Sequence, residues 1–98
     1  MELEEQKRAI EAILFASGER VEISRLSAVL EVDENEIEAV ADALLDTYAF
    51  ERRGIRIVKL ERGYQMVSAG EMADYVTRAL ETRKPPKLSS SQLETLTI

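Results

Sequence analysis

The 98-residue chain contains no cysteine, no histidine and no tryptophan. The lack of cysteine excludes a disulfide framework and any cysteine-based metal site. The lack of histidine removes the commonest general base and the commonest metal ligand. Carboxylates are plentiful, but paired acid–base catalysis needs them to converge in a cleft with separated pKa values. We therefore predict no catalytic residues, no metal site and no enzymatic activity.

Glycine and long apolar runs are also scarce. The four glycines stand alone, which excludes a glycine-rich phosphate-binding loop, and we predict no cofactor. No stretch approaches the roughly 18 apolar residues that a membrane-spanning helix needs. The first five residues are acidic and lack the basic-then-apolar order of a signal peptide. We expect a cytoplasmic protein with no membrane association.

The residues that are present indicate a small folded domain. Hydrophobic residues make up 45% of the chain and charged residues 33%, which argues against disorder. A domain of this length buries only about 60–65% of the surface that its unfolded chain exposes, so its core is thin. Pairing with a copy or a partner is one way for such a domain to gain stability.

The periodicity of residues 2–17 predicts a first helix, and Gly18 can take the left-handed conformation that ends helices. On a helical wheel its apolar side chains fill an arc of roughly 200°, wider than one core-facing stripe requires. These side chains are Leu3, Ala9, Ile10, Ala12, Ile13, Leu14 and Ala16. Phe15 lies beyond the arc. The excess indicates that this helix buries a second surface.

Two further helices follow with a very short connection between them. The pattern predicts a second helix over residues 23–30. It predicts a third over residues 33–50, which carry the clearest apolar repeat in the chain. Glu31 stands at the bend between them. Asp33 and Glu36 form a capping pattern at the start of the longer helix.

After residue 54 the period changes from helical to extended. Residues 55–60 and 64–68 predict two strands of a hairpin around a glycine turn, and Val21 is a short extended residue before the second helix. Residues 71–81 predict a fourth helix with Tyr75 on its apolar, core-facing side. Three helices followed by a hairpin is the order of a winged helix-turn-helix, a mainly α fold with a small β-hairpin.

The prolines divide the chain into two parts. Pro85-Pro86 cannot continue the fourth helix and marks a linker. The residues from 88 onward begin another capped amphipathic helix that stops after barely two turns. We expect residues 1–82 to form an N-terminal winged-helix domain. Residues 83–98 are expected to be a linker and the truncated start of a second winged-helix domain.

Acidic residues gather on the helix that would read DNA. In a helix-turn-helix the second helix of the motif enters the major groove, and here that helix is residues 33–50. It carries six acidic residues and no lysine or arginine, so it would repel phosphates. Three of the acids, Glu34, Glu38 and Asp42, recur at four-residue steps, which by itself predicts a solvated helix face.

Basic residues cluster instead around the hairpin and near the prolines. The cations of the hairpin are Arg52, Arg53, Arg56, Lys59 and Arg62. We interpret this placement as a bipolar surface, in which the basic hairpin meets acidic faces of its own chain or of a neighbour. A weak contact between the hairpin and phosphates is the alternative. Direct DNA binding is therefore not expected, and a winged-helix transcriptional regulator is the second hypothesis.

Apolar and aromatic side chains supply the candidates for a protein interface. The candidate interface residues are Leu3, Ile10, Ile13, Phe15 and Tyr64. Phe15 is the strongest because it lies off the main arc of the first helix, whereas Tyr64 at the start of a strand is ambiguous. Tyr48 and Tyr75 lie on predicted core faces and are expected to be structural.

Three segments in order resemble one known family. Residues 12–19, residues 63–67 and residues 83–89 are similar to the first-helix signature, the wing motif and the linker of segregation and condensation protein B. The resemblance covers essentially the whole chain. Departures include Arg20 where the family usually has proline, and Glu31 where it has the glycine of the bend. These changes affect individual turns and leave the element order intact.

The resemblance implies a function that the residue pattern alone does not. Members of this family have two winged-helix domains and form a homodimer through the N-terminal one. They bind the kleisin segregation and condensation protein A and, through it, the SMC ATPase. The resemblance therefore implies a non-enzymatic, nucleoid-associated subunit of a complex that condenses and segregates bacterial chromosomes. In that hypothesis this domain mediates the homodimer, and it is a candidate contact for the kleisin.

Overall fold

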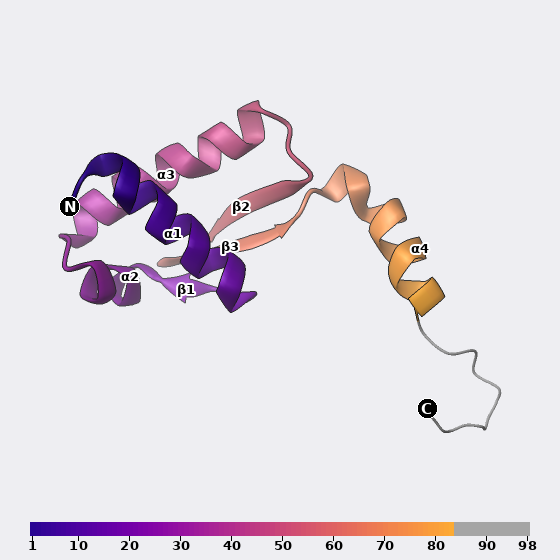
Figure 1. Cartoon of the computed structure of the whole chain (residues 1–98), viewed down its shortest axis with the longest axis horizontal. Helices are drawn as coiled ribbons and strands as arrows, with labels where there is room; N and C mark the ends of the chain where they lie inside the picture. The colour runs from indigo at the N-terminus through magenta and orange to yellow at the C-terminus, as the bar shows by residue number, and fades with distance from the viewer. Residues whose placement is uncertain (84–98) are drawn as a thin grey trace, which may run out of the picture.

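The computed structural model describes residues 1–83, so the predictions for the linker and second domain at 84–98 lie outside the described residues. The elements follow in the order α1 Leu3–Ser17, β1 Val21–Glu22, α2 Ile23–Leu30, α3 Glu34–Phe50, β2 Ile55–Leu60, β3 Gly63–Ser68, the 3-10 helix η1 Gly70–Met72 and α4 Ala73–Arg83. Figure 1 shows α1–α3 and the strands gathered in one body, with α4 extending away from it. The predicted winged helix-turn-helix is confirmed.

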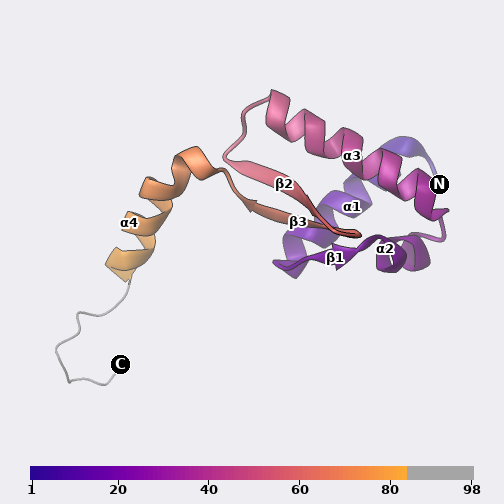
Figure 2. The same cartoon turned by 180° about the vertical axis from the view of Figure 1, so that it is seen from behind.

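The hairpin belongs to a three-stranded antiparallel sheet in the order β1-β3-β2. Ile55 of β2 pairs with Ser68 of β3, and Val21 of β1 pairs with Tyr64. Gly63 permits the approach of β1, because a Cβ at this position would lie 2.8 Å from the backbone oxygen of Val21. Seen from behind, the hairpin lies in front of α1, so α1 covers one face of the sheet (Figure 2).

The core lies between the three helices and the sheet. Its fully enclosed side chains come from every layer and include Ile10, Leu14, Ile23, Leu26, Ile37 and Tyr64. The apolar repeat of α3 provides one wall through side chains such as Ile37, Val40 and Tyr48. The periodicity therefore predicted the inward faces of α1, α2 and α3 correctly.

The helix ends depend on backbone conformation more than on capping side chains. Gly18 ends α1 in the left-handed region at φ 69°. Glu31 ends α2 in the same region at φ 58°, where glycine would be more comfortable. The Asp33 carboxylate caps α3 by accepting from the Asn35 backbone N–H at 2.9 Å. Glu36 does not complete a reciprocal capping box, because its carboxylate accepts from Gln6 Nε2 at 3.0 Å instead.

The fourth helix differs from the prediction in its packing. It begins at Ala73, after the short turn of η1, and its residues through Glu81 are exposed. The expectation that Tyr75 is a core residue was wrong, because its exposed fraction is 64%. The amphipathic pattern of this helix is real, but its apolar side does not face the body of its own chain.

Candidate functional site

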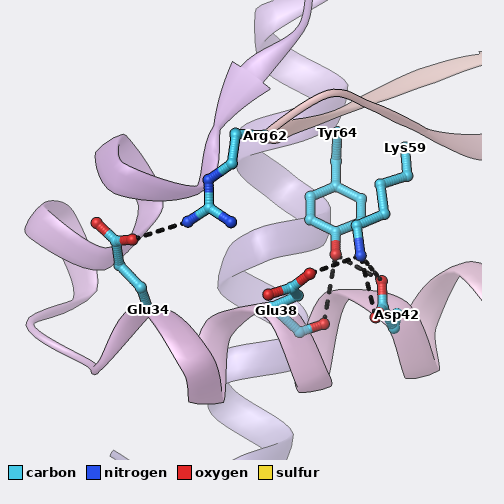
Figure 3. A network of polar contacts seen from close by, with 6 residues as sticks. All are labelled: Glu34, Glu38, Asp42, Lys59, Arg62 and Tyr64. Carbon is cyan, nitrogen blue, oxygen red and sulfur yellow. Dashed lines mark hydrogen bonds and ion pairs between the residues drawn. The ribbon is translucent and has the colours of Figure 1, made fainter.

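The basic hairpin lies against the acidic face of α3 and forms ion pairs with it (Figure 3). Lys59 Nζ lies 2.7 Å from the Glu38 carboxylate and 3.4 Å from the Asp42 carboxylate. Arg62 Nη2 lies 3.1 Å from the Glu34 carboxylate. The cations come from the end of β2 and the adjoining turn, so one edge of the hairpin is joined to the first half of α3.

Tyr64, which reaches from the hairpin towards α3 beside Lys59, completes this network (Figure 3). Its ring is buried, and its hydroxyl donates to Asp42 Oδ1 at 2.5 Å and approaches the Glu38 carbonyl oxygen at 3.4 Å. Burial raises the pKa of the Tyr64 hydroxyl, and the hydrogen bond to Asp42 raises it further. The hydrogen bond to Glu38 raises the pKa of the neighbouring Lys59. Both groups therefore keep their protons in the physiological range.

Intramolecular pairing changes what the two charged surfaces can bind. The spacing of the acids on α3 alone predicted a solvated face. Glu34, Glu38 and Asp42 do stay 33–46% exposed, but each is also paired with a cation of the hairpin. The interpretation that the basic hairpin meets an acidic face of its own chain is confirmed. Two more hairpin cations are also paired, Arg53 with Glu51 at 2.7 Å and Arg56 with Glu71 at 2.9 Å. Phosphates would therefore have to compete with acidic partners for these four cations, although the Arg62 side chain remains 68% exposed.

An apolar surface lies on another side of the body, where α1 ends beside the open end of the hairpin. Phe15 separates two shallow apolar grooves, one of about 240 Å³, and Ile55 and Met66 line both. The Phe15 side chain is 72% exposed. We call this surface, defined by Phe15, Ile55 and Met66, the Phe15 groove.

The polar rim of the Phe15 groove is satisfied within the chain. The Tyr48 hydroxyl donates to the Glu11 carboxylate, and both residues line one side of the groove. The Arg53 guanidinium lies over the Tyr48 ring at 4.4 Å from its centre. Burial raises the pKa of Tyr48, and the hydrogen bond to Glu11 adds to the effect. The Glu11 carboxylate at this rim is therefore already hydrogen-bonded within the chain.

The structure separates the five predicted interface residues into two groups. Leu3 and Phe15 are exposed at 52% and 72%, and Ile13 is half-buried beside the core. Ile10 and Tyr64 have no exposed surface. Ile10 lies in the middle of the arc of α1 that packs inward, and Tyr64 lies on the central strand under the network with α3. These two residues are core residues and are removed from the interface candidates.

Sequence reasoning missed Ile55 and Met66 as members of an exposed apolar surface. Ile55 and Ile57 point to the same side of β2 because side chains alternate along a strand. Ile57 is buried, whereas Ile55 lies at the end of the strand and is 36% exposed. An apolar residue at a strand end, two positions before a core residue, was the available signal.

Residues 1–83 offer neither a metal site nor a membrane-spanning helix. No group of three or more acidic side chains in this part of the chain is arranged to hold a metal ion. None of the helices described here is long and apolar enough to cross a membrane.

Comparisons with known proteins agree on one family. The model of the segregation and condensation complex subunit ScpB matches residues 8–98. Segregation and condensation protein B of Clostridioides difficile is 39% identical over the whole chain, which covers 56% of that protein. The protein of the same name from Geobacillus thermodenitrificans is 39% identical over 94% of the chain, which covers 44% of it. The chain thus spans about half the length of these relatives.

Solved structures show the same relationship. A dimer of the ScpB N-terminal domain complexed with an ScpA peptide is 36% identical, with a TM-score of 0.73, and the match covers 79% of this chain and 96% of that one. ScpB from Mycobacterium tuberculosis is 25% identical with a TM-score of 0.83, and the match covers 91% of this chain and 56% of that one. The family is described as a complex subunit and carries no enzyme name. With its winged fold and a match along nearly its whole length, this chain belongs to the segregation and condensation complex subunit ScpB family.

Proposed function

We propose that this chain is a non-enzymatic assembly module of a bacterial SMC–kleisin complex that condenses and segregates chromosomes. In this role it forms a homodimer and contacts the kleisin segregation and condensation protein A, which connects it to the SMC ATPase. One observation carries the proposal. The related N-terminal domain, matched over 96% of its length at 36% identity, is a dimer complexed with an ScpA peptide.

The surfaces of the molecule support assembly as its role. The Phe15 groove offers an exposed apolar area, and the charged groups at its rim are hydrogen-bonded within the chain. Exposed apolar surface of this kind is typical of protein contacts. The sequence offers no histidine or cysteine for catalysis, so the proposal includes no reaction. The charged network between α3 and the hairpin weighs against the alternative of a DNA-binding regulator. It pairs Lys59 and Arg62 with acidic residues of α3, and phosphates would have to compete with those acids.

The proposal extends to domain organisation and location. Residues 1–82 act as the N-terminal winged-helix domain, and residues 83–98 lead into a second domain of the same kind. The support is that the chain matches only about half of each full-length relative. Because a bacterial chromosome lies in the cytoplasm, the proposed location of the protein is the cytoplasm, at the nucleoid.

The test combines self-association with kleisin binding. Sedimentation equilibrium of the chain at rising concentration should show a dimer, and titration calorimetry should detect binding of a peptide from its cognate kleisin. Phe15→Asp should weaken self-association, because it puts a charge into an apolar surface. Phe50→Asp is the matched control, since Phe50 is 88% exposed and does not line the Phe15 groove. The proposal would be refuted if the chain stayed monomeric at high micromolar concentration and also showed no binding of the peptide.

A further inference from the structure

The α4 helix, together with Met72 at the end of η1, presents an apolar face that its own chain leaves exposed. Met72, Tyr75, Val76 and Leu80 are exposed at 37%, 64%, 37% and 47%. On a helical wheel of about 100° per residue they fall within an arc of roughly 140°. Asp74 and Arg78 lie on the opposite side, where they form an ion pair at 2.9 Å. The helix is therefore amphipathic in the manner of one that packs on a protein surface.

A helix of this length needs such a surface to be stable. It has 11 residues, and isolated helices shorter than about 12–15 residues are marginal in water. Its main packing within the described residues is with the adjoining η1. Both views show α4 directed away from α1 and α3, so its apolar side has no cover from that body (Figures 1 and 2).

The Phe15 groove is the complementary surface on the body. It is apolar, its one acidic lining residue is already bonded to Tyr48, and it lies beside the point where the chain leaves towards α4. Ser68, the last residue of β3, lines the groove directly. An apolar helix face could pack there and leave the hydrogen bond of Glu11 intact.

The direction of the chain after β3 keeps α4 from its own groove. The buried Ala69 donates its backbone N–H to the Gly54 carbonyl oxygen at 2.8 Å. The Glu71 carboxylate is paired with Arg56 of β2 at 2.9 Å. These two contacts hold η1 against the hairpin and set the outward course of α4. In the structure that results, α4 does not cover the Phe15 groove of its own copy.

We propose that α4 of one copy packs its Tyr75–Val76–Leu80 face, with the adjoining Met72 of η1, on the Phe15 groove of a second copy. It receives the partner's α4 in return. This inference rests on the proposed homodimer and says which surfaces form it. The related N-terminal domain is a dimer by itself, so an interface built only from this part of the chain is sufficient there. A reciprocal exchange closes with two-fold symmetry and covers both exposed apolar surfaces in one step.

Cysteine cross-linking tests the contact directly, because the natural chain has no cysteine. Differently tagged Phe15→Cys and Val76→Cys chains are mixed, allowed to exchange and oxidised. A mixed disulfide dimer should form, since the two positions face each other across the interface. The matched control pairs Phe15→Cys with Arg78→Cys, which lies on the opposite side of α4, and should give several-fold less mixed dimer. Val76→Asp should also weaken dimerisation at least about tenfold, whereas the adjacent Thr77→Asp should not.

The outcomes separate this inference from the proposed function. A dimer by sedimentation that gives equal cross-linking at Val76 and Arg78 keeps the homodimer and overturns the α4 exchange. A disulfide formed within single chains of a Phe15→Cys/Val76→Cys double variant shows α4 folded onto its own body, and also overturns it. A chain that stays monomeric at high micromolar concentration removes both the homodimer and the exchange.

Discussion

At the scale of single residues, Tyr64 is the link between the hairpin and α3. It is the largest fully buried side chain, and it occupies the central strand with Val21 on one side and Lys59 on the other. Its hydroxyl reaches past the core to the Asp42 carboxylate. One residue thus fills the core with its ring and joins the network of charged side chains through its hydroxyl.

Removing the Tyr64 hydroxyl should weaken the fold without emptying the core. In Tyr64→Phe the ring remains, and the hydrogen bond to a charged acceptor is lost. We expect the free energy of unfolding to fall by about 1–2 kcal/mol, measured by urea denaturation. Tyr75→Phe is the control, because Tyr75 is exposed and lies outside the network, and it should change stability by less than about 0.5 kcal/mol. Equal losses in the two variants would contradict the assigned role.

The same network predicts how stability depends on alkaline pH. The folded state raises the pKa of Tyr64 through burial and the bond to Asp42, and raises the pKa of Lys59 through the bond to Glu38. For a group with a raised pKa, the stabilisation is complete below the unfolded pKa and is lost as pH rises through the folded pKa. Stability should therefore hold to about pH 9 and fall above pH 10, near the unfolded values.

Urea denaturation repeated between neutral pH and pH 11 checks this profile. Tyr64→Phe should lose the part of the decline that belongs to tyrosine and should keep the parts that belong to Lys59 and to Tyr48, whose pKa is also raised. The pH at which the folded chain ionises can be followed by tyrosinate absorbance. A variant whose alkaline decline matches that of the natural chain would rule out Tyr64 as a contributor.

Residue patterns separated core from surface only in part. Phe15 stood out because it lay beyond the apolar arc of α1, and it is exposed. Ile10 lay inside an arc of roughly 200° that was too wide for one core face. A wheel gives the angular position of a side chain, but it does not say which part of a wide arc packs inward. That depends on where α3 and β3 lie, which is a property of the tertiary structure.

At the scale of elements, the bend between α2 and α3 carries backbone strain. Glu31 takes a left-handed conformation at φ 58°, and its backbone N–H bonds to the Ser27 carbonyl oxygen at 2.8 Å. A residue with a Cβ pays roughly 1–2 kcal/mol for this conformation, whereas glycine adopts it freely. The element order predicted from sequence was correct here even though the residue expected at the bend was absent.

Glycine at this bend should stabilise the domain. In Glu31→Gly the relief of strain exceeds the extra entropy that glycine gives to the unfolded chain. We expect a gain of about 0.5–1 kcal/mol in the free energy of unfolding, read from the shift of the urea midpoint. Glu31→Ala is the control, because it removes the same exposed carboxylate and keeps the Cβ. If alanine stabilised as much as glycine, the gain would come from charge and not from the backbone.

The elements also show where sequence prediction stops. The repeat in α3 and the alternation in β2 gave both elements almost to the residue, because their apolar periods match their own core. The repeat in α4 was equally clear, and it predicted a core-facing side that the body of the same chain does not cover. Amphipathicity indicates that one face of a helix is suited to burial. It does not distinguish the core of one copy from the surface of another.

At the scale of the whole molecule, the placement of charge decides what this winged helix can bind. The net charge is −6, but the hairpin is basic. Its cations are directed to α3 and its neighbours, so opposite charges meet inside one molecule. The sequence predicted both charge clusters. It did not give the register that brings Lys59 over Glu38 and Asp42, since that depends on how the hairpin lies against α3.

The same pairing predicts weak or no binding to duplex DNA. Removing the acidic partners of Lys59 and Arg62 should increase that binding. The natural chain should show no measurable binding to a duplex in low salt by fluorescence anisotropy. The triple variant Glu34→Gln/Glu38→Gln/Asp42→Asn changes the net charge from −6 to −3 and frees Lys59 and Arg62. It should bind weakly, and log Kd should depend on log salt with a slope of about 2, because two phosphates are neutralised.

A charge-matched variant separates local pairing from net charge. Glu2→Gln/Glu5→Gln/Glu19→Gln also changes the net charge from −6 to −3, but these exposed acids lie in and around α1, away from the hairpin. If the ion pairs with α3 suppress phosphate binding, this control should bind no better than the natural chain. Equal binding by the two variants would mean that net charge, and not the contact between hairpin and α3, keeps the molecule off DNA. Salt-dependent binding by the natural chain itself would show that the hairpin cations stay available despite their partners.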